Sequence, residues 1–188
     1  MEKTFNIILT GVGGQGLITL ISVINEAAFV EGYDVKSSEL HGLSQRGGSV
    51  EAHIRFGKKV NSPMITNGQV DLILATEALE GLREFSKAGK QTKILINEYF
   101  FPFINSPTKE EVKKQIQDSK KDYTFVKSSE ICKDKLQNEI VCTLHILGYA
   151  VGQKIIPIKK ESVLRAIKNV IPEKYLELNI NAFILGHG

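Results

Sequence analysis

The chain has 188 residues, of which 42% are hydrophobic and 24% are charged. This length suits one domain that buries a core of its own, and the composition is typical of a soluble globular protein. The net charge of +3 comes from 24 Lys and Arg against 21 Asp and Glu. So small an excess, with the lysines mixed among acids, argues against a protein that binds nucleic acid.

Two cysteines, Cys132 and Cys142, occur without any C-x-x-C spacing. A zinc ribbon or an iron–sulfur cluster held by this chain alone is therefore excluded, and no metal site is expected. No apolar run reaches the roughly 18 residues that span a bilayer, and the first residues do not resemble a signal peptide. We expect a protein of the reducing cytoplasm with no membrane contact.

The first part of the chain predicts strands on either side of a helix. Residues 5–10 and 33–38 are strand-like, and apolar residues recur at helical spacing between 15 and 31. These three elements would form a βαβ unit. Residues 49–56 then alternate apolar and polar side chains, which is typical of a strand with one polar face. We expect this strand to be antiparallel, so that the sheet is mixed.

The rest of the chain predicts more strands and helices and then a helical tail. The strands are expected at 70–75, 92–97 and 123–127, and the helices at 77–87 and 109–118. From Ser129 onwards the pattern is helical. No repeat or linker interrupts the chain. We predict a single α/β domain over 1–188, a three-layer sandwich with a mixed, mostly parallel sheet, a Rossmann-like start and a helical C-terminal portion.

The turn after the first strand is rich in glycine. Within six positions the chain has Gly11, Gly13, Gly14 and Gly16. Their spacing between a strand and a helix matches the dinucleotide-type fingerprint, in which backbone N–H groups at the helix start bind a phosphate or carboxylate. The alternative is a tight connection whose glycines serve packing alone. The amide of Gln15 could bond a ligand or cap the turn.

A second motif lies in the loop over residues 39–48. Six of its residues are candidates for binding an anionic ligand or for an interface: Glu39, His41, Gln45, Arg46, Gly47 and Gly48. Loops that leave the carboxyl ends of parallel strands share one crevice, so we expect this loop to face the glycine turn. The Arg46 guanidinium suits phosphate or carboxylate, with an ion pair to Glu39 as the alternative. His41 could carry a proton or make a structural hydrogen bond, and Glu39 lies near where a dinucleotide fold has its ribose-binding acid.

Other conspicuous residues are predicted to be structural. His53, on the polar face of its strand, is expected to be solvated or paired. His145, in an apolar helix, is expected to be a satisfied core residue. The aromatic cluster over residues 100–103 is expected to belong to the core, with an apolar patch for a partner as the alternative. No spacing typical of a nucleophilic triad or a histidine metal site occurs, so no catalytic residue is assigned.

Three segments carry a resemblance to a known family. They are residues 11–16 (Gly-Val-Gly-Gly-Gln-Gly), 39–42 (Glu-Leu-His-Gly) and 44–50 (Ser-Gln-Arg-Gly-Gly-Ser-Val). Together they resemble the gamma-type subunits of the 2-oxoacid:ferredoxin oxidoreductases. Within that family, the chain length and the ending, with Ala182-Phe183 and Gly186, are similar to the beta subunits of the indolepyruvate ferredoxin oxidoreductases.

The resemblance implies an accessory catalytic subunit of an enzyme that oxidatively decarboxylates an aryl 2-oxoacid, forms an acyl-coenzyme A and passes electrons to ferredoxin. Thiamine diphosphate and the iron–sulfur clusters would belong to a large alpha subunit. This chain would bind no cofactor alone, would form a heterodimer with that subunit and would be inactive without it. The glycine turn and the Arg46 loop would contact coenzyme A or seal the interface.

Besides a binding module with no chemistry at all, two alternatives to this function remain open at the level of sequence. One is the gamma subunit of a pyruvate or 2-ketoisovalerate ferredoxin oxidoreductase, because the quoted motifs are shared across the family. The other is a stand-alone NAD- or FAD-binding domain that uses the glycine turn and Glu39. This second alternative leaves the Gln45-Arg46-Gly47-Gly48 segment unexplained.

Overall fold

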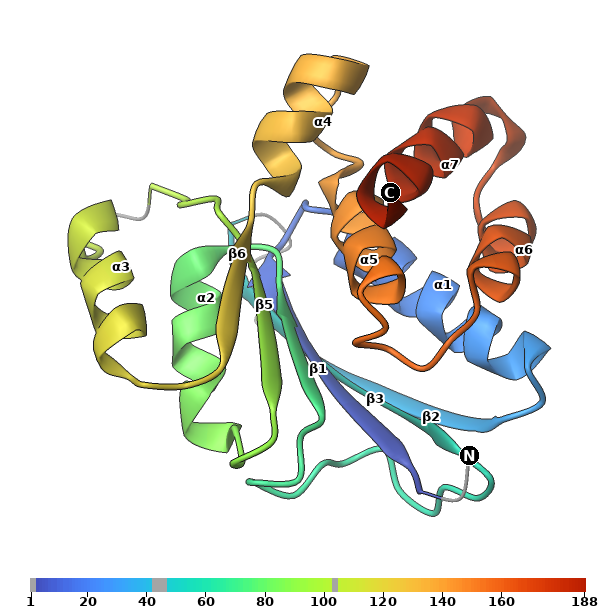
Figure 1. Ribbon diagram of the computed structural model, residues 1–188, viewed down its shortest axis with the longest axis horizontal. Helices are drawn as coiled ribbons and strands as arrows, with labels where there is room; N and C mark the ends of the chain where they lie inside the picture. The colour runs from blue at the N-terminus through green and yellow to red at the C-terminus, as the bar shows by residue number, and fades with distance from the viewer. Residues whose placement is uncertain (1–2, 42–46, 103–104) are drawn as a thin grey trace.

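The structure is a computed structural model that describes residues 3–41, 47–102 and 105–188 (Figure 1). Gln45, Arg46 and the side chain of His41, all predicted site residues, lie outside the described part of the chain. Among the described residues, six strands form one sheet in the order β2-β3-β1-β4-β5-β6. The strands are β1 (Phe5–Val12), β2 (Asp34–His41), β3 (Ser49–Gly57), β4 (Leu72–Ala75), β5 (Lys93–Asn97) and β6 (Tyr123–Val126).

The sheet is mixed and mostly parallel, as predicted. β4, β5 and β6 run parallel to β1, whereas β3 is antiparallel to both of its neighbours, β1 and β2. β2 therefore runs in the same direction as β1, but β3 lies between them. The predicted βαβ unit is wrong in this respect. Its two strands are not neighbours, because β2 and β3 form an antiparallel pair that places β3 against β1.

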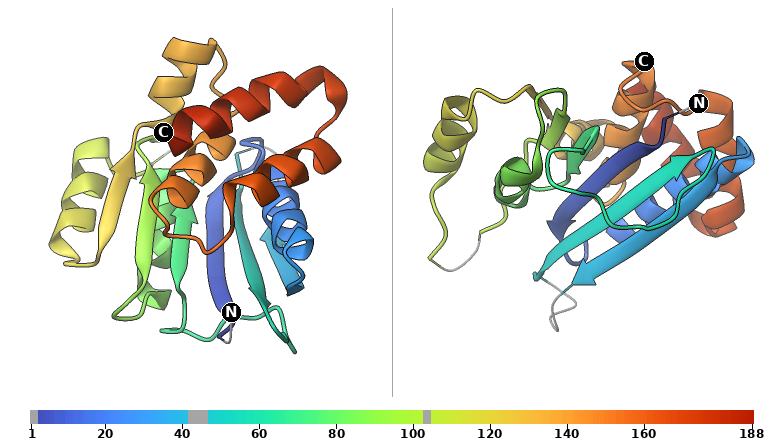
Figure 2. Two further views of the ribbon diagram at one scale, coloured as in Figure 1. Left: turned by 45° about the vertical axis from the view of Figure 1, so that its right-hand side comes forward. Right: turned by 90° about the horizontal axis from the view of Figure 1, so that it is seen from below.

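Helices cover both faces of the sheet and complete the predicted three layers (Figures 1 and 2). One layer contains α1 (Leu17–Val30), α5 (Cys142–Gly152), α6 (Lys160–Val170) and α7 (Glu173–His187). The other layer contains α2 (Ala78–Arg83), the 3₁₀ turn η1 (Glu84–Lys87) and α3 (Lys109–Asp118). The helix α4 (Ser128–Leu136) leads from β6 to α5. Neighbouring side chains of β1 serve opposite layers. Ile7 and Leu9 pack with the first layer, and Ile8 packs with the second. Phe100 packs against the second layer too, whereas Phe103 lies outside the described residues.

The polar face of β3 is covered rather than solvated. His53 is only 4% exposed. Its Nδ1 accepts a hydrogen bond from the Ile65 N–H at 3.0 Å, so Nε2 carries the proton and donates to Glu51 Oε1 at 2.7 Å. Burial alone would raise the pKa of Glu51, but hydrogen bonds from Lys87 and His53 outweigh it and hold this pKa below its usual value. The prediction that His53 is paired is thus confirmed, and the alternative that it is solvated is wrong. The reason is that η1 and the segment with Ile65 pack over this face of the sheet.

In the first helical layer, α5 and α7 approach so closely that their backbones touch. A Cβ atom at Gly148 would lie 2.1 Å from the carbonyl oxygen of Phe183, and one at Gly186 would lie 1.9 Å from that of His145. Such distances leave no room for any side chain. The packing of the two helices therefore depends on glycine at these positions.

We predict that Gly148→Ala lowers the free energy of unfolding by about 1–3 kcal/mol, because the added methyl group overlaps the α7 backbone. At an unobstructed helix position the same change would stabilise by up to about 1 kcal/mol, so the sign is diagnostic. Urea unfolding of the two proteins measures the difference. An unchanged or higher midpoint would show that α5 and α7 separate without cost.

His145 is a satisfied core residue, as predicted. It is 3% exposed, and its Nδ1 lies 2.9 Å from the hydroxyl of Ser128. Burial lowers the pKa of His145 from its ordinary value of 6.5. The folded state therefore holds this imidazole neutral at pH values where the unfolded chain protonates it.

We expect the unfolding free energy to fall as the pH drops below about 6.5, because the unfolded state then binds more protons at this site than the folded state does. His145→Gln keeps a polar group near Ser128 but does not titrate. Its unfolding free energy should therefore fall less between pH 7 and pH 5 than that of the unaltered chain. Urea titrations at fixed ionic strength measure both slopes, and equal slopes would contradict the assignment.

Candidate functional site

The carboxyl ends of β1, β4 and β5 meet at one edge of the sheet. The connection from β1 passes through α1 on one face, and that from β4 passes through α2 on the other (Figure 2). A point where connections part in this way leaves a crevice that commonly binds ligands. The glycine turn after β1 lies here, beside Thr76 after β4. The side-chain amide of Asn97, at the end of β5, donates to the Thr76 carbonyl at 3.1 Å.

Glycine is required in this turn for two different reasons. Gly14 and Gly16 have φ values of 99° and 79°, a left-handed conformation that favours glycine. At Gly11 the reason is packing, since a Cβ atom would lie 1.9 Å from the hydroxyl oxygen of Thr76. A Cβ atom at Gly14 would meet nothing within 4 Å. The packing role is therefore real at Gly11, whereas the outer side of the turn at Gly14 is open.

Gln15 caps the turn from inside. Its Oε1 accepts hydrogen bonds from the Val12 N–H at 2.8 Å and from the Thr76 hydroxyl at 2.7 Å. Its Nε2 donates to the Thr76 carbonyl at 3.4 Å. Of the two roles predicted for this amide, capping is the one that the structure shows.

The glycine turn and the end of the second motif lie side by side, as the sequence predicts. The N–H of Gly13 donates to the Gly48 carbonyl at 2.8 Å, and the N–H of Gly47 donates to the Gly13 carbonyl at 3.2 Å. Gln45 and Arg46 are the two residues before this contact in the chain. Ligand binding by these two residues and by His41 stays a prediction.

Glu39 and His41 are strand residues, not loop residues as expected. Both belong to β2, where Glu39 pairs with Ala52 of β3 and is exposed. In a dinucleotide fold the acid that binds the ribose ends a strand next to the first strand. Here β3 separates β2 from β1, so Glu39 is not in that relation to the glycine turn. The strand β2 ends later than its sequence pattern predicts, because pairing with β3 extends it past its apolar residues.

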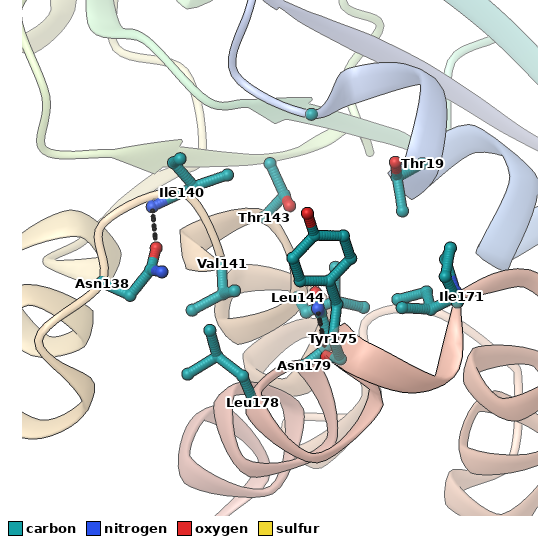
Figure 3. Close-up of a pocket in the computed structure, with 12 residues that line it drawn as sticks. Thr19, Asn138, Ile140, Val141, Thr143, Leu144, Ile171, Tyr175, Leu178 and Asn179 are labelled. Carbon is teal, nitrogen blue, oxygen red and sulfur yellow. Dashed lines mark hydrogen bonds between the residues drawn. The ribbon is translucent and has the colours of Figure 1, made fainter.

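Two pockets among the described residues flank the glycine turn and share Ile140 as a wall. The smaller, of about 190 Å³, lies at the sheet edge beside Gly14, Tyr99 and Cys142. The larger, of about 430 Å³, lies between the start of α1 and the helices α5 and α7 (Figure 3). Residues that line it include Gly16, Thr19, Thr143, Tyr175, Leu178 and Asn179.

The residues that α5 and α7 bring to this pocket have no counterpart among the sequence predictions. Thr143 and Tyr175 carry no local signal of function, since their helices have only the ordinary pattern of apolar residues. The packing of α5 places Thr143 beside Gly16 at the start of α1, and the packing of α7 on α5 adds Tyr175. The glycine turn predicted from sequence therefore forms one side of a site whose other side could not be predicted.

The buried thiols and Tyr99 are held in their protonated forms. Burial raises the pKa of Cys142 to about 11 and that of Cys132 to about 12. Burial, and then the charge of Glu139, raises the pKa of Tyr99. At neutral pH these thiols are therefore poor nucleophiles and poor metal ligands.

The residues present do not fit an iron–sulfur cluster, which requires several thiolate ligands. Within the described ranges, no group of three or more His, Cys, Asp or Glu is placed to hold a metal ion. The same ranges contain no helix that combines the length and the apolar character needed to cross a membrane.

The structure defines an α/β protein of three layers, with a glycine turn at the edge of the sheet where the connections part. Residues 6–188 match the family described as pyruvate ferredoxin/flavodoxin oxidoreductase. The chain belongs to this family, as the three sequence segments predicted.

Relatives of two kinds match most of the chain. The indolepyruvate oxidoreductase subunit IorB of Pyrococcus horikoshii is 32% identical, over 98% of this chain and 95% of the relative. The common gamma subunit of the pyruvate/ketoisovalerate oxidoreductases of Pyrococcus abyssi is 29% identical, over 92% of this chain and 89% of the relative. The chain is thus a gamma-type subunit of the 2-oxoacid:ferredoxin oxidoreductases.

A solved structure shows the same fold within a longer chain. The 2-oxoglutarate:ferredoxin oxidoreductase of Magnetococcus marinus, determined with 2-oxoglutarate, coenzyme A and succinyl-CoA bound, superimposes with a TM-score of 0.73 at 17% identity. The match covers 99% of this chain and 31% of the other. In that enzyme, a region with this fold is about a third of a single polypeptide.

We predict that Gln15→Ala lowers the free energy of unfolding by about 1–3 kcal/mol, because the Val12 N–H and the Thr76 hydroxyl lose their partner. Urea unfolding measures the loss. Gln117→Ala, on the exposed side of α3, is the matched control and should change the value by less than about 0.5 kcal/mol. Equal effects at the two sites would show that Gln15 does not hold the turn.

Proposed function

We propose that this chain is the accessory catalytic subunit of an indolepyruvate, or more generally arylpyruvate, ferredoxin oxidoreductase. The enzyme would oxidatively decarboxylate an aryl 2-oxoacid with coenzyme A and pass the electrons to ferredoxin. The observation that carries the proposal is the closer match to the indolepyruvate relative, 32% over 98% of the chain, than to the pyruvate/ketoisovalerate relative, 29% over 92%. A gamma subunit of a pyruvate or 2-ketoisovalerate enzyme is the second candidate.

The proposed division of labour gives the redox chemistry to a large alpha subunit. That subunit would hold thiamine diphosphate, which supplies the decarboxylation chemistry, and the iron–sulfur clusters, which carry the electrons. The present chain has two cysteines, both buried and with raised pKa, and these do not supply such ligands. We therefore expect a heterodimer that is active only when both subunits are present, in the reducing cytoplasm where free thiols persist.

The contribution of this chain would be to bind and to position. The open side of the glycine turn, at Gly14, and the uncapped start of α1 present backbone N–H groups at the ligand-binding edge of the sheet. The predicted binding residues Gln45 and Arg46 precede the contact between Gly47 and Gly13. These features suit either contact with an anionic part of coenzyme A or closure of the interface with the large subunit.

A stand-alone NAD- or FAD-binding domain is disfavoured by the strand order. Such a domain places the second strand beside the first, so that an acid at its end meets the ribose. In this chain β3 occupies that place, and Glu39 is exposed on β2. The glycine spacing alone does not overcome this difference.

Reconstitution with the large subunit tests the proposal. We expect coenzyme A-dependent dye reduction with indolepyruvate or phenylpyruvate only when both purified subunits are mixed, because neither carries the whole site. The initial rate is compared across indolepyruvate, phenylpyruvate, pyruvate and 2-ketoisovalerate.

Each outcome separates the candidates. Activity of the large subunit alone, at the rate of the mixture, would contradict an accessory catalytic role. A preference for pyruvate or 2-ketoisovalerate would favour the second candidate. Omission of coenzyme A is the control that distinguishes formation of an acyl-coenzyme A from simple decarboxylation.

A further inference from the structure

Two buried carboxylates, Glu77 and Glu80, lie in the segment that follows β4. Each residue is only 1% exposed. Burial raises the pKa of Glu77 from its ordinary value of 4.5, so its ionised form is less favoured in the folded chain than in water. Carboxyl groups perturbed in this way cluster at functional sites. The hydrogen-bond partners of the two residues therefore show what they serve.

Glu77 holds the segment that follows β5. Its Oε1 accepts a hydrogen bond from the Phe101 N–H at 3.1 Å, and its Oε2 accepts one from the Glu80 N–H at 2.7 Å. The N–H of Ala78 also donates to the Tyr99 carbonyl at 2.9 Å. Since Tyr99 lines the smaller pocket beside the glycine turn, Glu77 fixes one side of the crevice to the start of α2.

Glu80 holds the segment at the start of β3. Its Oε2 accepts a hydrogen bond from the Ser49 hydroxyl at 2.6 Å, and its Oε1 accepts one from the Arg83 guanidinium at 2.8 Å. Ser49 directly follows Gly47 and Gly48, which are bonded to the glycine turn. Glu80 therefore fixes the other side of the crevice to the same helix.

The two sides of the crevice also meet each other away from α2. A Cβ atom built on Gly47 would lie 3.9 Å from Cζ of Phe101, so these two residues are neighbours. The contacts form a closed ring that runs from Gly47 through Ser49 and Glu80 to Glu77, and returns through Phe101. Residues in one such network influence one another. A break at one point should therefore loosen both sides.

We propose that Glu77 and Glu80 are positioning residues, which hold residues 47–49 and residues 99–101 as one unit beside the glycine turn. The inference deepens the proposed function and rests on it for the reaction that is served. Glu77 and Glu80 would act on that reaction only through these two segments. Positioning of this kind matters because a displacement of about 1 Å in a site is enough to slow a reaction severely.

The two carboxylates should respond differently to replacement by an amide. In Glu77→Gln the side-chain NH₂ group would face a backbone N–H, so one of the two hydrogen bonds is lost. In Glu80→Gln both bonds survive, because the Ser49 hydroxyl accepts from the NH₂ group while the amide oxygen still accepts from Arg83. The loss of negative charge is the same in both variants. A difference between them therefore reports on the hydrogen bonds.

Amide hydrogen exchange of the full chain tests the positioning without any partner. We expect Glu77→Gln to raise the exchange rates of the Phe101 and Gly47 N–H groups at least about fivefold. Ser49→Ala and Glu80→Ala should do the same, including at Phe101, to which neither residue is bonded. Glu80→Gln should restore both rates to within about twofold of the unaltered chain.

Glu84→Gln is the matched control. Glu84 is also buried, at 7% exposed, but its Oε2 lies 2.8 Å from Nζ of Lys87 in η1. Its replacement should leave the exchange rates of Phe101 and Gly47 within about twofold of those of the unaltered chain. Ser49 is exposed, so Ser49→Ala keeps the fold even if Glu77→Gln disturbs it.

The reconstituted complex gives a second readout. Glu77→Gln, Ser49→Ala and Glu80→Ala should lower the coenzyme A-dependent rate at least about fivefold, because the crevice loses its geometry. Glu80→Gln should recover the rate, since it keeps the bond to Ser49. A role confined to stability would not produce recovery by the amide at Glu80 together with failure of the amide at Glu77.

Three results would overturn the inference. They are equal effects of the amide at Glu77, Glu80 and Glu84, a Ser49→Ala chain whose exchange at Phe101 is unchanged, and complex rates that do not follow the order of the exchange rates. An inactive complex of unaltered subunits contradicts only the proposed function, because the exchange rates still decide the positioning. An active complex whose small chain shows no coupled exchange contradicts only this inference.

Discussion

The tight turn at the end of β1 is the constraint on which the site depends. Backbone hydrogen bonds join Gly13 to Gly47 and Gly48 before β3, and Gln15 joins the turn to Thr76 after β4. These contacts join three adjacent strands, β3, β1 and β4, at one edge of the sheet. Because these contacts use the inner groups of the turn, its outer side and the first N–H groups of α1 are left for another molecule.

The second determinant is the crossing of α5 and α7. Gly148 and Gly186 let the two backbones touch, and residues of the last helix line the pocket together with the start of α1 (Figure 3). One pocket wall therefore comes from the beginning of the chain and the other from its end. A site of this kind exists only in the folded state, since its two halves are joined by packing rather than by sequence.

Charge is distributed in a way that suits binding rather than redox chemistry. Burial holds the thiols of Cys132 and Cys142 protonated, and the ion pair of Glu51 on β3 with Lys87 of η1 keeps both of these charges in their ionised forms. The edge of the sheet beside the glycine turn offers instead backbone N–H groups, hydroxyls and apolar walls. Such groups suit the binding of a ligand or the closure of an interface, which is the role proposed for this chain.

The sequence by itself determined the elements, the mixed sheet, the glycine turn and the family. These follow from local causes: hydrophobic periodicity, the conformations that only glycine adopts readily, and motifs of neighbouring residues. It also placed the glycine turn beside Gly47 and Gly48, because loops at the carboxyl ends of like-directed strands share an edge. Only the tertiary structure decided that β3 separates β2 from β1, that Gln15 is used internally and that Thr143 and Tyr175 complete the pocket. Strand order and helix crossing depend on how separate segments bury their apolar faces together, and no local pattern encodes which of them become neighbours.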